Sequence, residues 1–147
     1  MNSKEVKQIY LFLQSEFGCD HKFDFVFLRS SKDKVYVLNR DVELIDFNKL
    51  HIDTAGLYIG KFYSDGFRLS VEGSQLFAPY VSKNLVEVSD LHFVDWLTGS
   101  DLVDFVGEDR FVILKYKKDF LGCAKVKNNV ALNSLPKARR LKVINYG

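Results

Sequence analysis

Hydrophobic positions near the N-terminus repeat with a helical period. They fall at the spacings i, i+3, i+4, i+7 and i+11, which lie on one face of an α-helix: Val6, Ile9, Tyr10, Leu13 and Phe17. Asn2 followed by Glu5 is a capping pair that favours a helix start, and Gly18 favours its end. The pattern therefore predicts one amphipathic helix before residue 18.

Short segments rich in aromatic and β-branched residues follow, separated by turn residues. Polar residues 30–33 and the sequence Ser64-Asp65-Gly66 each separate two such segments, which predicts two β-hairpins. The expected strands are residues 23–29, 34–39, 57–63 and 67–71. Short helices are expected at residues 41–49 and 73–78, the second ending near Pro79.

The pattern changes after residues 80–84, where short strands dominate. We expect a helix over 91–97 behind Ser89 and Asp90 as caps, and a turn at 117–119. The expected strands are residues 85–88, 110–116, 120–126 and 139–144. This predicts an α+β chain: an N-terminal α/β domain with an antiparallel sheet at residues 1–82, followed by a small β-barrel at residues 83–147.

The composition is that of a globular protein, with 47% hydrophobic and 27% charged residues. No apolar run approaches the length of a membrane span, and the N-terminus lacks the apolar centre of a signal peptide. We therefore expect no membrane association and a cytoplasmic location, or a nuclear or nucleolar one in a eukaryote. Cys19 and Cys123 lack a CxxC partner and are expected to be buried, reduced thiols.

Charge is distributed unevenly along the chain. Residues 1–84 are neutral, residues 85–109 carry seven acids and no Lys or Arg, and residues 110–147 carry ten basic residues against one acid. A basic block of this kind favours an acidic partner, most often nucleic acid. The alternative is that the acidic and basic segments neutralise each other within one domain.

No group of residues indicates catalysis. The glycines at 56 and 60 lack the lysine and following helix of a phosphate loop, and no GxSxG nucleophile motif occurs. His21, His51 and His92 are scattered, which is unfavourable for a metal site. Asp101 and Asp104 are interpreted as solvated turn residues. We expect no enzyme activity, no catalytic residues, no metal and no cofactor.

Residues 56–80 carry a specific pattern of motifs. They read Gly56, Gly60-Lys61-Phe62, Phe67-Arg68-Leu69 and Phe77-Ala78-Pro79-Tyr80. This segment resembles the Nip-seven family of ribosome-biogenesis factors, with Phe77 in place of the usual leucine. Residues 93–99 and 121–126 resemble the early helix and later glycine-containing strand of a PUA domain, a small RNA-binding barrel. Ala124 replaces a second glycine that such domains usually have.

The resemblance implies a non-catalytic RNA-binding factor that acts in large-subunit ribosome assembly and pre-rRNA processing. Its expected partners are single-stranded, uridine-rich pre-rRNA and other assembly factors bound by the N-terminal domain. The resemblance places the RNA surface on the basic PUA domain at Lys137, Arg139, Arg140 and Lys142. Charge alone adds Lys125 and Lys127 on the preceding strand.

Two questions stay open at this level. A strand over 139–144 would place successive basic side chains on opposite faces, so we favour a loop over residues 137–140 that can gather around RNA. The function also has alternatives: a protein–protein adaptor of pre-ribosomal assembly factors, or an accessory RNA-binding domain for an RNA-modification enzyme.

Overall fold

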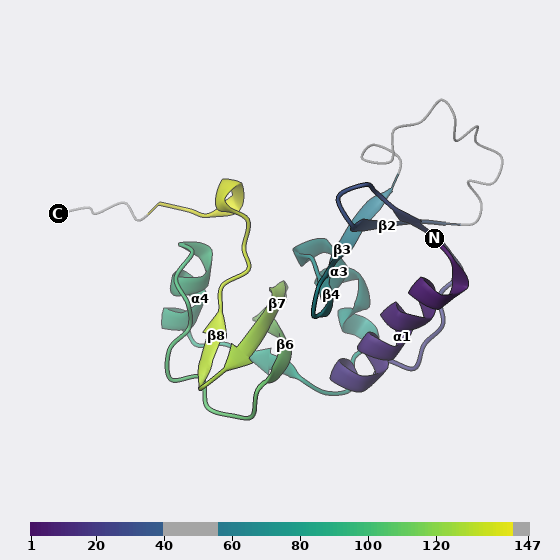
Figure 1. The fold of residues 1–147 in the computed structure, drawn as a ribbon. Helices are drawn as coiled ribbons and strands as arrows, with labels where there is room; N and C mark the ends of the chain where they lie inside the picture. The colour runs from purple at the N-terminus through teal and green to yellow at the C-terminus, as the bar shows by residue number, and fades with distance from the viewer. Residues whose placement is uncertain (40–55, 143–147) are drawn as a thin grey trace.

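A computed structural model of the chain describes residues 1–39 and 56–142 (Figure 1). The helix expected at 41–49, His51 and the end of the strand expected at 139–144 lie outside these residues. The first half contains α1 (Ser3–Phe17), β1 (Phe25–Arg29), β2 (Lys34–Asn39), β3 (Leu57–Tyr63), β4 (Gly66–Leu69), α3 (Val71–Phe77) and the 3-10 helix η3 (Ala78–Tyr80). The second half contains β5 (Leu85–Glu87), α4 (Asp90–Leu97), β6 (Arg110–Tyr116), β7 (Asp119–Lys127), β8 (Val130–Leu132) and the 3-10 helix η4 (Lys137–Arg139).

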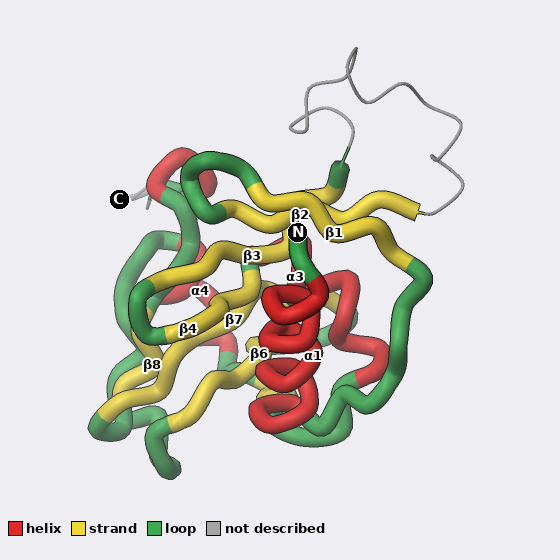
Figure 2. Tube along the Cα trace, turned by 45° about the vertical axis from the view of Figure 1, so that its right-hand side comes forward, coloured by secondary structure: helices red, strands yellow, loops and turns green. Residues whose placement is uncertain are grey.

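Helix α1 forms as its sequence predicts. The Asn2 side chain accepts a hydrogen bond from the Glu5 amide at 2.9 Å, and the Glu5 carboxylate accepts one from the Asn2 amide. Gly18 ends the helix in the left-handed conformation at φ 62°. The apolar face is buried, and α1 contacts both β4 and β6, so it touches both sheets (Figure 2).

The first sheet is antiparallel in the order β1-β2-β3-β4: the two predicted hairpins are the pairs β1–β2 and β3–β4, and pairing of β2 with β3 joins them. Its register shifts between Val35 and Tyr36: Val35 pairs with Gly60, whereas Tyr36 pairs with Tyr58. Ile59 therefore has no pairing partner on β2, as in a β-bulge. The bulge changes which strand positions point to the core, so Ile59 is fully buried and Lys61 points to the opposite face.

The second sheet has the order β5-β6-β7-β8, and only β5 runs parallel to its neighbour. A parallel pair needs a crossover connection, which α4 and the segment after it supply. The predicted α+β class, with an antiparallel N-terminal sheet before a second β-structure, is confirmed. The two sheets and their helices are shown in Figure 1.

The prediction of a strand over 139–144 is wrong for residues 139–142, which are the part of it that the structure describes. Residues 137–139 form η4, and residues 140–142 belong to no strand. The available edge of β7 is already taken by β8, which pairs Leu132 with Lys125. The Leu141 amide instead donates to the Leu97 carbonyl at 2.8 Å, so the chain runs past the end of α4. The favoured loop over 137–140 agrees with this course.

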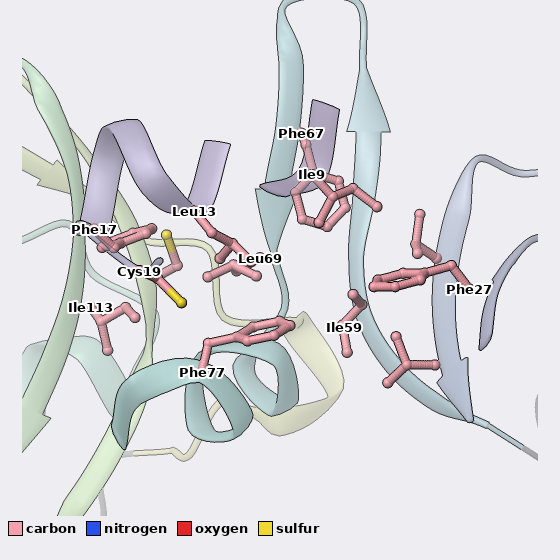
Figure 3. Close-up of a cluster of buried hydrophobic side chains, with 13 residues drawn as sticks. Ile9, Leu13, Phe17, Cys19, Phe27, Ile59, Phe67, Leu69, Phe77 and Ile113 are labelled. Atoms are coloured by element: carbon pink, nitrogen blue, oxygen red, sulfur yellow. The ribbon is translucent and has the colours of Figure 1, made fainter. Parts of the chain in front are cut away.

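The two halves share buried side chains. The larger apolar cluster joins Ile9, Leu13 and Phe17 of α1 to Ile113 of β6 and Cys123 of β7. Figure 3 shows Ile113 beside Phe17 and Cys19 in this cluster. Helix α3 packs against both β3 and β7. The division at residues 82 and 83 stays a prediction. Within the described residues, no helix has the length and apolarity to span a membrane.

Candidate nucleic-acid interface

A cavity of about 540 Å³ lies where the two halves meet. Strands β3 and β4 and helix α3 form one wall, and β6, β7 and the segment leading into η4 form the other. The lining combines aromatic, cationic and small polar side chains, among them Tyr58, Tyr63, Arg68, Glu72, Phe111, Lys125, Asn133, Ser134 and Arg139. Two of the six predicted RNA-binding residues, Lys125 and Arg139, therefore lie at one cavity.

Ion pairs connect the cavity cations to acids of the first half. Lys125 Nζ lies 3.6 Å from Asp65, and Arg139 Nη2 lies 2.5 Å from Glu72. Arg68 also contacts Asp65, an acid of the same hairpin, at 2.8 Å. The hydrogen bond from Arg68 is the main reason that the pKa of Asp65 is lowered. Three cations against two acids leave one net positive charge here.

Arg68 has one donor group that these contacts leave unused. Its Nε is buried and makes no hydrogen bond to the described residues. Its guanidinium carbon lies 4.7 Å from the centre of the Tyr63 ring. A buried N–H without a partner is costly, and its cost falls when a ligand supplies an acceptor. Arg68 is thus a functional candidate that the sequence motif alone did not assign.

The remaining predicted cations do not gather at the cavity. Lys137 and Lys142 are exposed at and just after η4, and neither makes an ion pair within residues 1–39 and 56–142. Lys127 pairs with Val130 at the β7–β8 turn, which lies at the far end of the second sheet from η4 (Figure 1). The six predicted RNA-binding residues therefore do not all lie at the cavity, because β7 extends away from it after Lys125.

Arg140 has a structural role. Its Nε donates to the Leu135 carbonyl at 2.9 Å, and its side chain covers Gly99. A Cβ at Gly99 would lie 2.5 Å from Arg140 Cδ, and the φ of Gly99 is +91°. The Arg140 side chain is thus held by Leu135 and packs over Gly99 just after α4, so replacing Arg140 is expected to alter the fold there.

Three further residues have clear positions. Trp96 is fully buried and donates from Nε1 to the Leu121 carbonyl, as expected of a core residue. Tyr116 stacks on Phe93 with ring centres 3.9 Å apart and donates to Asp90, so it has a packing role. Ala124 is fully buried, so the alanine that replaces a PUA glycine lies in the core and not at a solvent-facing surface.

The acidic segment 85–109 does not neutralise the basic one. Among the described residues, no ion pair joins the two. The acidic side chains hydrogen-bond loops and a tyrosine instead: Glu87 accepts from the Lys117 amide, Asp90 from Tyr116, Asp101 from the Asn133 amide and Asp109 from the Asn128 amide.

The floor of the cavity includes Cys123, which is buried and unpaired by disulfide, as is Cys19. The prediction of two buried thiols is confirmed. Burial raises the pKa of Cys123 to about 12, so its thiolate is scarce at neutral pH. Over the residues that the structure describes, no three His, Cys, Asp or Glu side chains cluster as a metal site.

Comparison with known proteins identifies the second half. Residues 83–141 match the family model of the methyltransferase RsmF PUA domain. No curated protein matches the chain at a significant level. The chain therefore contains a PUA-like domain, which implies RNA as a partner and agrees with the resemblance at residues 93–126. The resemblance of residues 56–80 to the Nip-seven family stays a prediction.

Proposed function

We propose that this chain is a non-catalytic RNA-binding protein that holds single-stranded, uridine-rich RNA at the cavity between its halves. The match of residues 83–141 to a PUA domain carries the proposal. The cavity supports it with cations on both walls, Arg68 on one and Lys125 and Arg139 on the other. Lys137 and Lys142 extend the positive charge beyond the cavity along the C-terminal segment.

Binding would exchange internal ion pairs for contacts to phosphate. A phosphate beside Arg139 competes with Glu72 for the guanidinium, which can hold phosphate through two parallel hydrogen bonds. The unused Nε of Arg68 offers a further donor to a phosphate or a base. Tyr63 is 47% exposed and can contribute an aromatic surface to an unpaired base.

The proposed function is recognition and not catalysis. The polar groups around the cavity are mainly fixed cations and hydroxyls. Glu72 is engaged by Arg139, and Cys123 holds its proton far above neutral pH. The thiol is therefore not poised to move a proton near neutral pH, which acid–base catalysis requires.

Two biological settings use this same binding. The motifs at residues 56–80 favour large ribosomal subunit assembly and pre-rRNA processing, with other assembly factors bound by the N-terminal domain. The matched PUA domain is that of a methyltransferase, which favours an accessory RNA-binding role for an RNA-modification enzyme. Crosslinking in cells separates them: sites spread over pre-ribosomal RNA favour the first, and sites confined to RNA near modified nucleotides favour the second.

RNA binding itself is tested by fluorescence anisotropy with a labelled uridine-rich RNA at two salt concentrations. Each phosphate contact to a single strand contributes about −0.7 to the log–log salt slope. The double variant Lys137→Gln/Lys142→Gln should therefore flatten the slope by about 1.4. The control Lys4→Gln/Lys7→Gln, on the exposed side of α1, should leave it unchanged. Absent binding, or binding insensitive to salt, contradicts the proposal.

A further inference from the structure

The first sheet carries a row of three cations on the face away from its core. Lys34 pairs with Lys61 across β2 and β3, and Lys61 pairs with Arg68 across β3 and β4. We call these three residues the cation row. The bulge at Ile59 creates it, because Ile59 and Phe62 can then both pack inward while Lys61 points outward with its two neighbours.

Tyrosine rings lie between these cations. Lys34 Nζ lies 5.4 Å from the centre of the Tyr58 ring. Tyr63 is approached by two cations, Lys61 at 5.1 Å and Arg68 at 4.7 Å. Such cation–π contacts hold flexible side chains over the sheet and reduce the conformational freedom that binding would otherwise have to remove.

The charges of the row are poorly compensated. Like charges directly opposite each other on neighbouring strands destabilise a sheet. Within the described residues, Asp65 pairs with Arg68, whereas Lys34 and Lys61 make no ion pair. A bound polyanion would relieve this repulsion, and a phosphate chain that crosses the strands can contact all three cations.

The row is continuous with the cavity. Arg68 belongs to both, and Tyr58 and Tyr63 also line the cavity. We propose that the RNA strand held at the cavity continues across β4, β3 and β2, with its phosphates on Lys34, Lys61 and Arg68. This second contact surface lies outside the PUA domain. It rests on the proposed function, because it extends the same bound strand.

The test compares two RNA lengths. A uridine tetranucleotide should occupy the cavity alone, whereas a uridine dodecanucleotide should also reach the row. The variant Lys34→Gln/Lys61→Gln should weaken the dodecanucleotide roughly 10- to 30-fold at about 0.1 M salt and flatten its salt slope by about 1.4, because two contacts are lost. It should leave the tetranucleotide unchanged. The control Lys4→Gln/Lys7→Gln removes the same charge from α1 and should change neither.

Each result has one meaning. Unchanged dodecanucleotide affinity in the variant overturns the cation row while the proposed function stands. Failure of wild-type protein to bind either RNA overturns both. If polyglutamate competes with the dodecanucleotide as strongly as unlabelled RNA does, the row is a site for an acidic protein, and the proposal fails. A thermal midpoint of the variant equal to or above that of the wild type confirms that binding was altered without loss of folding, since removing two opposed like charges does not weaken the sheet.

A tyrosine pair tests how the row is positioned. Tyr63→Phe keeps the ring beneath Lys61 and Arg68, whereas Tyr63→Leu removes it. The ratio of dodecanucleotide to tetranucleotide affinity, in which any stacking at the cavity cancels, should survive the first change and fall about fivefold or more with the second, which is the loss of one ordered contact. An equal ratio in both variants would contradict positioning by the ring.

Discussion

The cations at the rim of the cavity, Lys125 and Arg139, differ in their surroundings from the cations of the C-terminal segment, Lys137 and Lys142. At the rim, Lys125 and Arg139 are each held by an acid from the first half of the chain. Around η4, Lys137 and Lys142 are exposed and make no ion pair to the described residues. One set therefore joins the two halves and is oriented before RNA arrives, whereas the other is free to contribute long-range attraction.

The difference shows that the density of charge along a sequence does not indicate which charges are available. Arg139 and Arg140 are adjacent, yet Arg139 contacts Glu72 at the cavity, whereas Arg140 donates to the Leu135 carbonyl and packs over Gly99 after α4. Variants that reverse all the basic residues of this segment would disturb structure and binding together. Structure and binding are separated when the rim cations, Cys123 at the floor of the cavity and the exposed residues Lys137 and Lys142 are changed in separate variants.

The rim should be the most sensitive to mutation. Lys125→Gln/Arg139→Gln should lower the affinity for uridine-rich RNA about 25-fold at about 0.1 M salt, since two phosphate contacts are lost. Urea unfolding should also show a loss of up to about 1 kcal/mol, because these partly exposed ion pairs are screened by solvent. Lys137→Gln/Lys142→Gln should lower the affinity for RNA without changing the free energy of unfolding. If the two variants lose equal stability, the structural role of the rim pairs is wrong.

The floor of the cavity should respond to pH. The folded Cys123 thiol keeps its proton up to about pH 12, against an ordinary pKa of 9.0. Unfolded protein therefore binds fewer protons in this range, and stability falls as pH rises. The loss between about pH 9 and 10.5 should be about 2 kcal/mol. Urea unfolding of Cys123→Ala should show a flatter pH dependence; parallel curves for the two proteins would contradict burial of the thiol.

Freeing Arg139 from its acidic partner should raise the affinity for RNA, whereas removing a rim cation should lower it. Glu72→Gln frees Arg139 from its carboxylate while keeping a similar side-chain shape. RNA affinity should rise up to about fivefold, because phosphate no longer has to displace the carboxylate from Arg139, whereas the salt slope should stay the same because the number of phosphate contacts does not change. Fluorescence anisotropy with labelled RNA measures the affinity of the variant. A lower affinity would mean that Glu72 orients Arg139 for RNA and does not compete with RNA for the guanidinium.

The smallest effect is expected from Tyr116→Phe. This tyrosine has Lys115 and Lys117 as neighbours in sequence, but its ring stacks on Phe93 and its hydroxyl donates to Asp90. The change keeps the stacked ring and removes only the hydroxyl, so RNA affinity should be unchanged. A clear loss of affinity would place RNA on the side of the second sheet that faces α4.

The parts of the fold that depend on local sequence were predictable. Helix α1 has its capping pair and its glycine stop, and the hairpin turns contain their usual residues. Strand β8 was missed although a local signal exists. Asn128 and Asn129 have φ values of 53° and 62°, as a two-residue hairpin turn requires, and asparagine tolerates this conformation. Strand β8 has three residues, which is too short to recognise from its own hydrophobic pattern unless the turn before it is identified.

The site was only partly predictable because its contacts join distant residues. The Arg139–Glu72 pair forms because α3 packs against β7, which no local pattern encodes. The cation row was hidden by the bulge at Ile59, which breaks the strict alternation expected of β3. The basic character of the C-terminal segment was visible in the sequence, but its division into paired, packed and exposed cations required the fold.

The central claim is that RNA occupies the cavity between the halves, and an amide NMR titration with uridine-rich RNA tests it most directly. The account predicts shifts that cluster at Tyr63, Arg68, Lys125 and Arg139 and that saturate together at one dissociation constant. Shifts confined to residues 85–109, or no saturable shifts near the cavity, would contradict it.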